Sequence, residues 1–242
     1  MKGLNYPKVV EGNGKSTIQF IPGLLGDERS FEEVGRYFLQ DGYRVIRVSY
    51  PCHPFSLQDF AEDLLSELDS PATVVGTSMG GYVAQLMARA EPGKIENLVL
   101  VNTFPSAKAI LGGTRWLIKL FRFLPKSLIK GQIKRGMKDE HFGGNPEIRK
   151  RIEEFLDSIN PAALYYRLAA LADAPEIRCF PEGIHTIVFF TKGDPTVPES
   201  LKEQLIEKVN PHLVYEFEEG GHFPYLHNPE KFYKILKSAL EE

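Results

Sequence analysis

Hydrophobic positions along the chain follow two periods, one typical of strands and one typical of helices. Short apolar runs rich in β-branched residues predict buried strands, and segments with apolar residues every three or four positions predict helices with one buried face. The predicted strands are residues 6–10, 16–21, 43–49, 72–75, 95–101, 184–190 and 212–217. The predicted helices are residues 30–40, 57–68, 82–89, 197–209 and 229–240. This alternation is typical of a mostly parallel sheet flanked by helices on both faces, an α/β fold.

Residues 103–183 interrupt the alternation, because they contain helical periodicities and no convincing strand. We therefore expect an α-helical cap at 103–183, inserted into a core made of residues 1–102 and 184–242. Within the cap, a segment without acidic residues carries the basic residues Arg115, Lys119, Arg122, Lys126, Lys130, Lys134, Arg135 and Lys138. Apolar residues on another face predict an amphipathic helix that ends near Pro125; they are Trp116, Leu117, Leu120, Phe121 and Leu124.

Two interpretations of this basic helix stay open. It could be a lid that contacts a lipid surface or an anionic substrate, since cationic amphipathic helices bind such surfaces. It could equally be an ordinary cap helix whose apolar face packs over the site while its lysines remain solvated. Either interpretation favours a substrate with an apolar acyl or aromatic part.

A glycine-flanked serine, Ser78, comes between the predicted strand 72–75 and the predicted helix 82–89. Its surroundings, Gly-Thr-Ser-Met-Gly over residues 76–80, have the G-x-S-x-G pattern of a nucleophile elbow. Such a turn holds the serine hydroxyl beyond the strand, at a helix N-terminus that favours developing negative charge. A plain strand-to-helix turn is the alternative, so the prediction depends on partners elsewhere in the chain.

Asp194 and His222 directly follow the last two predicted strands. A serine nucleophile needs a base, and that base needs an acceptor that fixes its tautomer. Because the carboxyl ends of parallel strands share one edge of the sheet, we predict a catalytic triad of Ser78, Asp194 and His222, in that chain order. Alternatively, Asp194 caps the following helix and His222 is a buried histidine bonded to a backbone carbonyl. The competing acid position after strand 95–101 holds Asn102.

The glycine-rich loop after strand 16–21 is expected to complete the site. We predict an oxyanion hole made by the backbone N–H groups of Leu24 and Met79, with Leu25 as the fallback if the loop is shifted by one residue. Four further residues are predicted to contact substrate, namely Gly23, Leu25, His53 and Trp116. His53 follows a strand next to Cys52, whereas Cys179 is predicted to be a small core residue.

Composition narrows the classes of protein without identifying a substrate. Of 242 residues, 43% are apolar and 25% are charged, and the net charge of -3 implies no general attraction to nucleic acid. Two cysteines form no disulfide framework, and no secretory signal is visible, so a cytoplasmic location is expected. The sequence contains no metal-ligand spacing and no Walker-type phosphate loop. No cofactor is expected, because acyl transfer by a triad requires none.

Several of these segments resemble the α/β-hydrolase superfamily over essentially the whole chain: the elbow at 76–80, then 193–198, 221–224 and 228–230. Shorter pieces resemble the maspardin branch: 42–46, 50–51, 98–104 and 220–226. Many family members carry a histidine before the oxyanion glycine, where this chain has Pro22. Maspardin is thought to have another residue at the position of His222, so the histidine here favours an active enzyme.

The resulting hypothesis is a serine hydrolase, a carboxylesterase that cleaves short- to medium-chain esters of small molecules through an acyl-enzyme. A carbon–carbon bond hydrolase or a perhydrolase with the same triad is one alternative. A non-catalytic, maspardin-like binding protein is another. Membrane contact through the basic cap, as in an interfacial lipase, is a further alternative.

Overall fold

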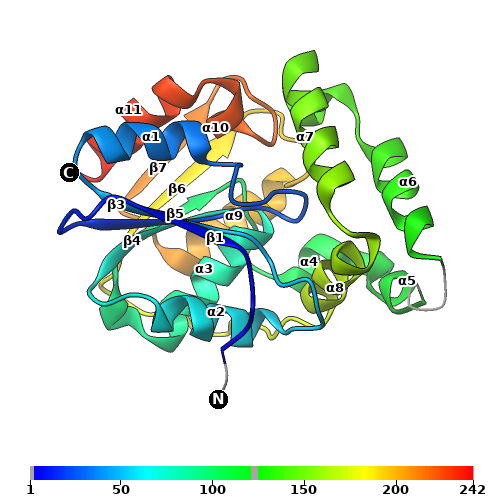
Figure 1. Cartoon of the computed structure of the whole chain (residues 1–242), viewed down its shortest axis with the longest axis horizontal. Coiled ribbons are helices and arrows are strands. Elements are labelled where there is room, and N and C mark those ends of the chain that lie inside the picture. Colours follow the sequence, from blue (N-terminus) through cyan, green and yellow to red (C-terminus); the bar gives the residue numbers. More distant parts are fainter. Residues whose placement is uncertain (1–2, 121–124, 242) are drawn as a thin grey trace.

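A computed structural model describes residues 3–120 and 125–241, which form a seven-stranded sheet with helices on both faces (Figure 1). The strand order is β1-β3-β2-β4-β5-β6-β7, and all neighbours are parallel except β1 and β3. The strands are β1 Lys8–Glu11, β2 Thr17–Ile21, β3 Arg44–Val48, β4 Ala72–Thr77, β5 Ile95–Val101, β6 His185–Thr191 and β7 Leu213–Phe217. The α/β fold predicted from the sequence is therefore confirmed.

The first two strands are neighbours in sequence but do not pair with each other. β1 lies antiparallel to β3, with Lys8 opposite Val48, while β2 is held between β3 and β4. The turn-forming residues 12–15 therefore lead the chain from the edge of the sheet into its interior and do not form a hairpin.

Two groups of helices cover the sheet, one on each face. In Figure 1, α1 and α11 lie above the sheet with the short α10, and α2 and α3 lie below it. The bounds of these helices and of α9 are α1 Glu32–Gln40, α2 Leu57–Ser66, α3 Met79–Ala90, α9 Glu199–Val209, α10 Pro224–His227 and α11 Pro229–Ala239. Side chains at helix starts satisfy backbone N–H groups, as where Ser56 accepts from Asp59 N and Asn228 accepts from Lys231 N.

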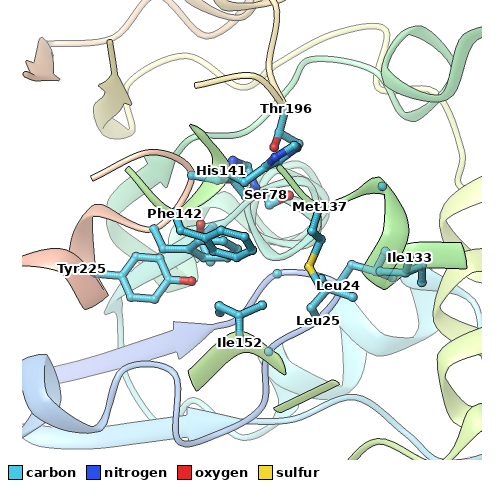
Figure 2. Close-up of a pocket in the computed structure, with 16 residues that line it drawn as sticks. Leu24, Leu25, Ser78, Ile133, Met137, His141, Phe142, Ile152, Thr196 and Tyr225 are labelled. Carbon is cyan, nitrogen blue, oxygen red and sulfur yellow. The ribbon is translucent and has the colours of Figure 1, made fainter. Parts of the chain in front are cut away.

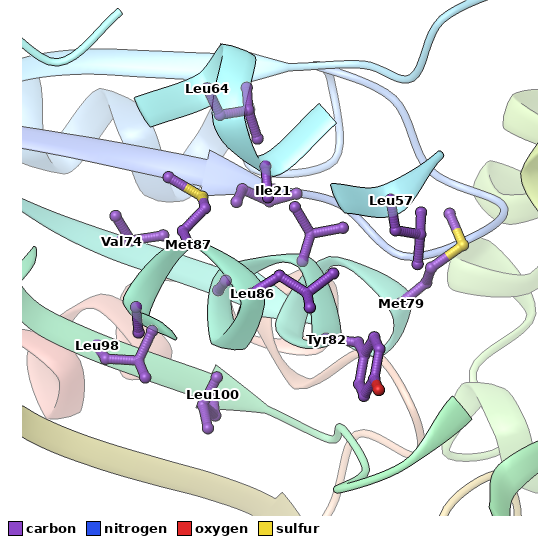
Figure 3. Packing of buried hydrophobic residues seen from close by; sticks show 14 of the residues in the cluster. Ile21, Leu57, Leu64, Val74, Met79, Tyr82, Leu86, Met87, Leu98 and Leu100 are labelled. Carbon is purple, nitrogen blue, oxygen red and sulfur yellow. The ribbon is translucent and has the colours of Figure 1, made fainter. Parts of the chain in front are cut away.

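The largest core lies between the sheet and the α2–α3 face. Figure 3 shows Leu57 and Leu64 of α2 above Leu86 of α3, with Val74 and Leu98 supplied by the sheet. All are fully buried, which agrees with the apolar periodicity of these segments. Truncating one of these leucines to alanine would cost about 2–5 kcal/mol, so this packing fixes the position of α3 under the end of β4.

Among the described residues between β5 and β6, five α-helices lie at one end of the sheet (Figure 1). They are α4 Ala107–Leu111, α5 Arg115–Leu120, α6 Lys126–Gly136, α7 Pro146–Ser158 and α8 Pro161–Ala172, and short 3-10 turns at Gly112–Thr114 and Asp139–Phe142 connect some of them. A small core of their own includes Ile118, Leu156 and Leu164. We refer to this helical segment as the cap.

The predicted basic helix is only partly described. Arg122, Phe121 and Leu124 lie outside the described residues, as do the side chains of Lys119, Leu120 and Lys126. Trp116 is 61% exposed and Leu117 is also exposed, so the apolar face predicted from them does not pack over the site. Ile118 is buried in their place because the helix turns that position toward α8.

The exposure of Cys179 and the length of the helices bear on two further expectations. Cys179 is exposed, so its predicted place in the core is wrong; it lies in the irregular segment between α8 and β6, which buries Ile177 in the core and leaves Cys179 facing outward. In residues 3–120 and 125–241, every helix is too short or too polar to cross a bilayer.

Candidate active site

Ser78 occupies a strained turn between β4 and α3. Its φ of 52° lies in the left-handed region, which is rare for a residue with a side chain and costs about 1–3 kcal/mol. Close packing forces this geometry, because a Cβ on Gly76 would lie 2.4 Å from the Gly80 carbonyl oxygen. The turn is held by Ser78 N–H, which donates to Val101 O at 3.0 Å, and by the Thr103 hydroxyl, which donates to Ser78 O at 2.6 Å.

The loop that follows β7 brings His222 to buried Asp194. His222 Nδ1 lies 2.7 Å from Asp194 Oδ2, and both residues are buried. Gly220 and Gly221 have φ values of 117° and 57°, which a residue with a Cβ adopts only with strain, and they turn the chain back toward the sheet. The structure thus brings together two residues that are separated by a strand and a helix in sequence. With Nδ1 engaged, Nε2 is the ring nitrogen left to accept a proton.

Asp194 is held in its ionised form by its neighbours. Burial alone would raise the pKa of the Asp194 carboxyl, but the charge of His222 and hydrogen bonds from His222 and Thr196 lower it below its usual value. Thr196 N–H donates to Asp194 Oδ1 at 2.8 Å, so this carboxylate also stabilises the turn before α9. The alternative that Asp194 caps the following helix is wrong, because α9 begins after Pro198 and no side chain caps it. The bond from Thr196 N–H lies in the preceding turn and is compatible with the histidine contact.

The Ser78 hydroxyl makes no hydrogen bond to His222 or to any other residue in the described ranges. Catalytic hydrogen bonds are often long in the absence of substrate and tighten when substrate binds. Ser78 and His222 both line the same cavity.

Asn102, which the sequence indicated only as the residue at the competing acid position, has a structural role at this site. It follows β5 with a φ of 41°, and its side chain is fully buried. Asn102 Nδ2 donates to Thr191 Oγ1 at 3.0 Å and to Gly221 O at 3.2 Å, while its Oδ1 accepts from Thr191 N–H. Asn102 therefore ties the loop of His222 to the end of β6. In the sequence, the only indication of this role was a polar residue directly after a buried strand.

The predicted oxyanion donors, Leu24 and Met79, and the fallback Leu25 have unpaired backbone N–H groups in the part of the chain that the structure describes. A Cβ on Gly23 would lie 3.3 Å from Ser78 Cβ, so the loop after β2 passes directly beside the serine. Gly26 N–H donates to Gly23 O at 3.0 Å and closes this loop into a tight turn.

Side chains from two distant segments hold the same loop. The Tyr50 hydroxyl donates to Pro22 O at 2.6 Å. Arg167, on α8 of the cap, donates from Nη1 to Leu24 O at 2.9 Å and to Gly26 O at 2.8 Å, and its guanidinium lies 5.0 Å from the centre of the Tyr50 ring. Burial lowers the pKa of Arg167. Because the arginine is deeply buried, these contacts fix the peptides on either side of Leu24 N–H.

One cavity of about 250 Å³ contains most of these groups (Figure 2). Sixteen residues line it, namely Gly23, Leu24, Leu25, Gly26, Thr77, Ser78, Ile133, Gly136, Met137, His141, Phe142, Ile152, Thr196, His222, Phe223 and Tyr225. The predicted contact residues Gly23 and Leu25 are among them, whereas His53 and Trp116 are not. Asp194 lies behind His222, fully buried.

Metal-ligating residue types do not gather at this site. Within residues 3–120 and 125–241, no three side chains from His, Cys, Asp and Glu come close enough together to hold a metal ion.

The chain is similar in sequence and in structure to known proteins. A family model described as "Alpha/beta hydrolase family" matches residues 20–235. A pimeloyl-(acyl-carrier protein) methyl ester esterase of Neisseria meningitidis is 23% identical over 210 residues, covering 78% of this chain and 76% of that protein. A protein of the same name from Aromatoleum aromaticum is 26% identical over 233 residues, covering 84% and 90%. The structure of a thermophilic esterase from Thermogutta terrifontis superposes with a TM-score of 0.81 at 20% identity, covering 98% of this chain and 93% of that one.

Proposed function

Because the chain belongs to the alpha/beta hydrolase family, we propose that it is a serine hydrolase that cleaves carboxylic esters with short to medium acyl chains. The observation that carries the proposal is the 2.7 Å contact between His222 Nδ1 and Asp194 Oδ2, beside a cavity that also contains the strained Ser78. The names of the relatives from Neisseria and Aromatoleum, both methyl ester esterases, support the same bond type.

In the proposed reaction, His222 Nε2 takes the hydroxyl proton of Ser78 as Oγ attacks the ester carbonyl carbon. The carbonyl oxygen becomes an oxyanion and accepts hydrogen bonds from the N–H groups of Leu24 and Met79. The intermediate collapses, the bond to the alkoxy oxygen breaks, and the proton on His222 passes to the departing alcohol. Asp194 keeps Nδ1 of His222 protonated throughout and stabilises the imidazolium.

The second half of the reaction repeats this chemistry with water. His222 removes a proton from a water molecule, which attacks the acyl-enzyme carbonyl, and the same two N–H groups bind the second oxyanion. Collapse returns the proton to Ser78 Oγ and releases the carboxylic acid. No redox step or added cofactor enters this balance.

The test is Ser78→Ala on a p-nitrophenyl ester series that runs from acetate to octanoate. Loss of the nucleophile is expected to lower kcat by about 10⁴–10⁶-fold while the thermal melting temperature stays near that of the wild type. Ser66→Ala is the matched control, because its hydroxyl bonds only to Asp63 O on the surface of α2. Undiminished turnover in Ser78→Ala would contradict the proposal.

Labelling by a fluorophosphonate separates the enzyme from the alternative of a maspardin-like binding protein. An activated serine reacts with this reagent, so the folded wild type should be labelled and Ser78→Ala should not. A panel that adds carbon–carbon bond substrates and peracid formation then separates an esterase from a hydrolase of another class with the same triad.

A carrier-bound methyl ester is a second candidate substrate. The relatives from Neisseria and Aromatoleum carry that activity in their names. The cap of this chain has exposed cations in and just after the cavity-lining helix α6, such as Arg135 and Lys138. Hydrolysis of a methyl ester on an acyl carrier protein, compared with the same ester on a small thiol, measures whether the carrier contributes. A rate that is equal for both would contradict this candidate.

We also propose that residues 1–102 and 184–242 form the catalytic core and residues 103–183 form the cap. The continuous β5–β6 pairing supports this division, because it joins the two halves of the core across the inserted segment.

A further inference from the structure

Two hydroxyl groups in the cavity have no role in the proposed reaction. Thr77, the last residue of β4, is 1% exposed, and Tyr225 of α10 is 2% exposed. Both line the cavity that contains Ser78. In Figure 2 the Tyr225 hydroxyl points into this cavity.

The Thr77 hydroxyl has no hydrogen-bond partner of normal geometry within the described residues. Buried hydroxyl groups almost always have a partner, since leaving one unpaired is costly. The Tyr225 hydroxyl is its polar neighbour: burial raises the pKa of Tyr225, and a hydrogen-bond interaction with the Thr77 hydroxyl opposes that rise. The phenol therefore remains protonated and can donate a hydrogen bond. The geometry of the interaction with Thr77 falls short of a normal hydrogen bond, so the Thr77 hydroxyl can still turn to a ligand.

Aromatic packing fixes the direction of the Tyr225 hydroxyl. Its ring stacks on Phe31 with 4.2 Å between centroids and 22° between planes. Phe232 contacts it nearly edge-on, at 6.1 Å and 72°. A ring held on two sides cannot turn its hydroxyl elsewhere, so the donor is preorganised toward the cavity.

The surroundings of these hydroxyls select an uncharged ligand group. Phe142 and Ile152, both fully buried, form apolar walls at this end of the cavity. No Asp, Glu, Lys or Arg is among the described residues that line the cavity, so a carboxylate here would lack a counter-charge. A carbonyl or hydroxyl oxygen could accept from both hydroxyls without that cost.

This end of the cavity is also the closed one. Leu24, Leu25 and Met137, at the other end, are only half-buried. In ester hydrolysis the alcohol leaves first and water replaces it, so the leaving group requires the open end. The acyl group stays on the serine through both steps and fits the closed end.

We propose that Thr77 and Tyr225 form a polar subsite that binds an uncharged oxygen, a keto or hydroxyl group, on the acyl chain of the substrate. This inference rests on the proposed ester hydrolysis at Ser78 and specifies its substrate class: oxygen-bearing acyl chains are preferred over plain alkyl chains of equal length. Thr77 and Tyr225 act as specificity-determining residues in this proposal.

The experiment compares matched p-nitrophenyl esters that differ by one keto oxygen: levulinate against valerate, and acetoacetate against butyrate. The wild type is expected to favour at least one keto ester by about 10-fold in kcat/KM, because a donor pair built for an oxygen penalises the analogue that lacks it. Thr77→Val and Tyr225→Phe keep side-chain volume and remove only the hydroxyl, and in each the ratio should fall toward one. Tyr233→Phe is the control, since its hydroxyl bonds to Asp41 on the surface, and its ratio should equal that of the wild type.

A binding measurement separates this inference from the proposed function. The same ester pairs are titrated into Ser78→Ala by calorimetry, with and without Thr77→Val or Tyr225→Phe. A keto preference in binding that disappears with either hydroxyl supports the subsite even if the wild type hydrolyses no ester. A wild-type ratio near one for both pairs, or a ratio that neither substitution changes, overturns the subsite while leaving ester hydrolysis intact.

Discussion

Replacing Arg167 by methionine would separate the stability of the fold from the geometry of the oxyanion loop. The guanidinium donates to Leu24 O and Gly26 O, and its Nε has no partner among the described residues. Two hydrogen bonds from a charged donor contribute about 1.5–3 kcal/mol each. Against this stands the cost of desolvating a cation without a carboxylate partner, several kcal/mol. We expect these to nearly cancel, so Arg167→Met should change the free energy of unfolding by less than about 2 kcal/mol.

The effect on catalysis should be much larger. Leu24 N–H lies in the peptide directly before the carbonyl that Arg167 holds, so the loop would relax and weaken one of the two predicted oxyanion donors. Losing such a donor costs about 10²–10³-fold in kcat, or about 2.7–4 kcal/mol. Partial displacement of the loop should therefore lower kcat by about 10-fold or more, with little change in KM because the oxyanion forms only in the transition state.

The assay is steady-state hydrolysis of p-nitrophenyl butyrate beside urea denaturation of the same samples. Arg167→Lys should recover part of kcat, since an ammonium group can donate to one of the two carbonyls. Arg115→Met is the control: its guanidinium bonds to Ala172 O at the end of the same cap helix and does not touch the loop. The reasoning is refuted if kcat is unchanged, or if it falls only in proportion to the fraction of unfolded protein.

The remaining predictions concern titratable groups. Asp194→Asn should lower kcat by about 10⁴-fold, because the amide no longer selects the productive tautomer of His222. Since the pKa of Asp194 is lowered in the folded state, its carboxylate stabilises the protein above about pH 4, and this contribution is lost as the pH falls further. The free energy of unfolding, measured by circular dichroism, should therefore decrease less between about pH 4 and lower pH in Asp194→Asn than in the wild type. Burial lowers the pKa of Lys208 from 10.5 to about 8, so between these values the unfolded chain binds more protons and the free energy of unfolding should rise with pH. Urea denaturation from about pH 7 to about pH 10 should show no such rise in Lys208→Met, and an identical rise in that variant would contradict the assignment.

The parts of the fold with a local signal could be predicted from the sequence. β5 has the predicted bounds, Ile95–Val101, because its last four residues form a buried apolar run rich in β-branched side chains, which is typical of a central parallel strand. The strained turn at Ser78 could be predicted because only glycines permit the close approach of Gly76 to Gly80. The nearness of Asp194 to His222 followed from one topological rule, that parallel strands end at a common edge. Their catalytic roles remain predictions.

Contacts between distant segments had no such signal. Arg167 stands 143 residues after Leu24, in a helix whose pattern indicated only a cap. The pairing of β1 with β3 was likewise invisible, because turn residues specify a change of direction and not a partner. Trp116 looked like part of a buried face, but the helix around it is short and buries Ile118 instead.

The loop of His222 has a backbone contact with the cap that parallels the contact of Arg167 with the other loop. His222 N–H donates to His141 O at 2.8 Å, and a Cβ on Gly221 would lie 2.5 Å from the same oxygen. A cap taken from another protein would have to reproduce a buried arginine and a backbone carbonyl at the positions of Arg167 and His141. Directed evolution of new specificity should therefore begin inside the cavity, at residues such as Ile152, and leave the backbone of the cap unchanged.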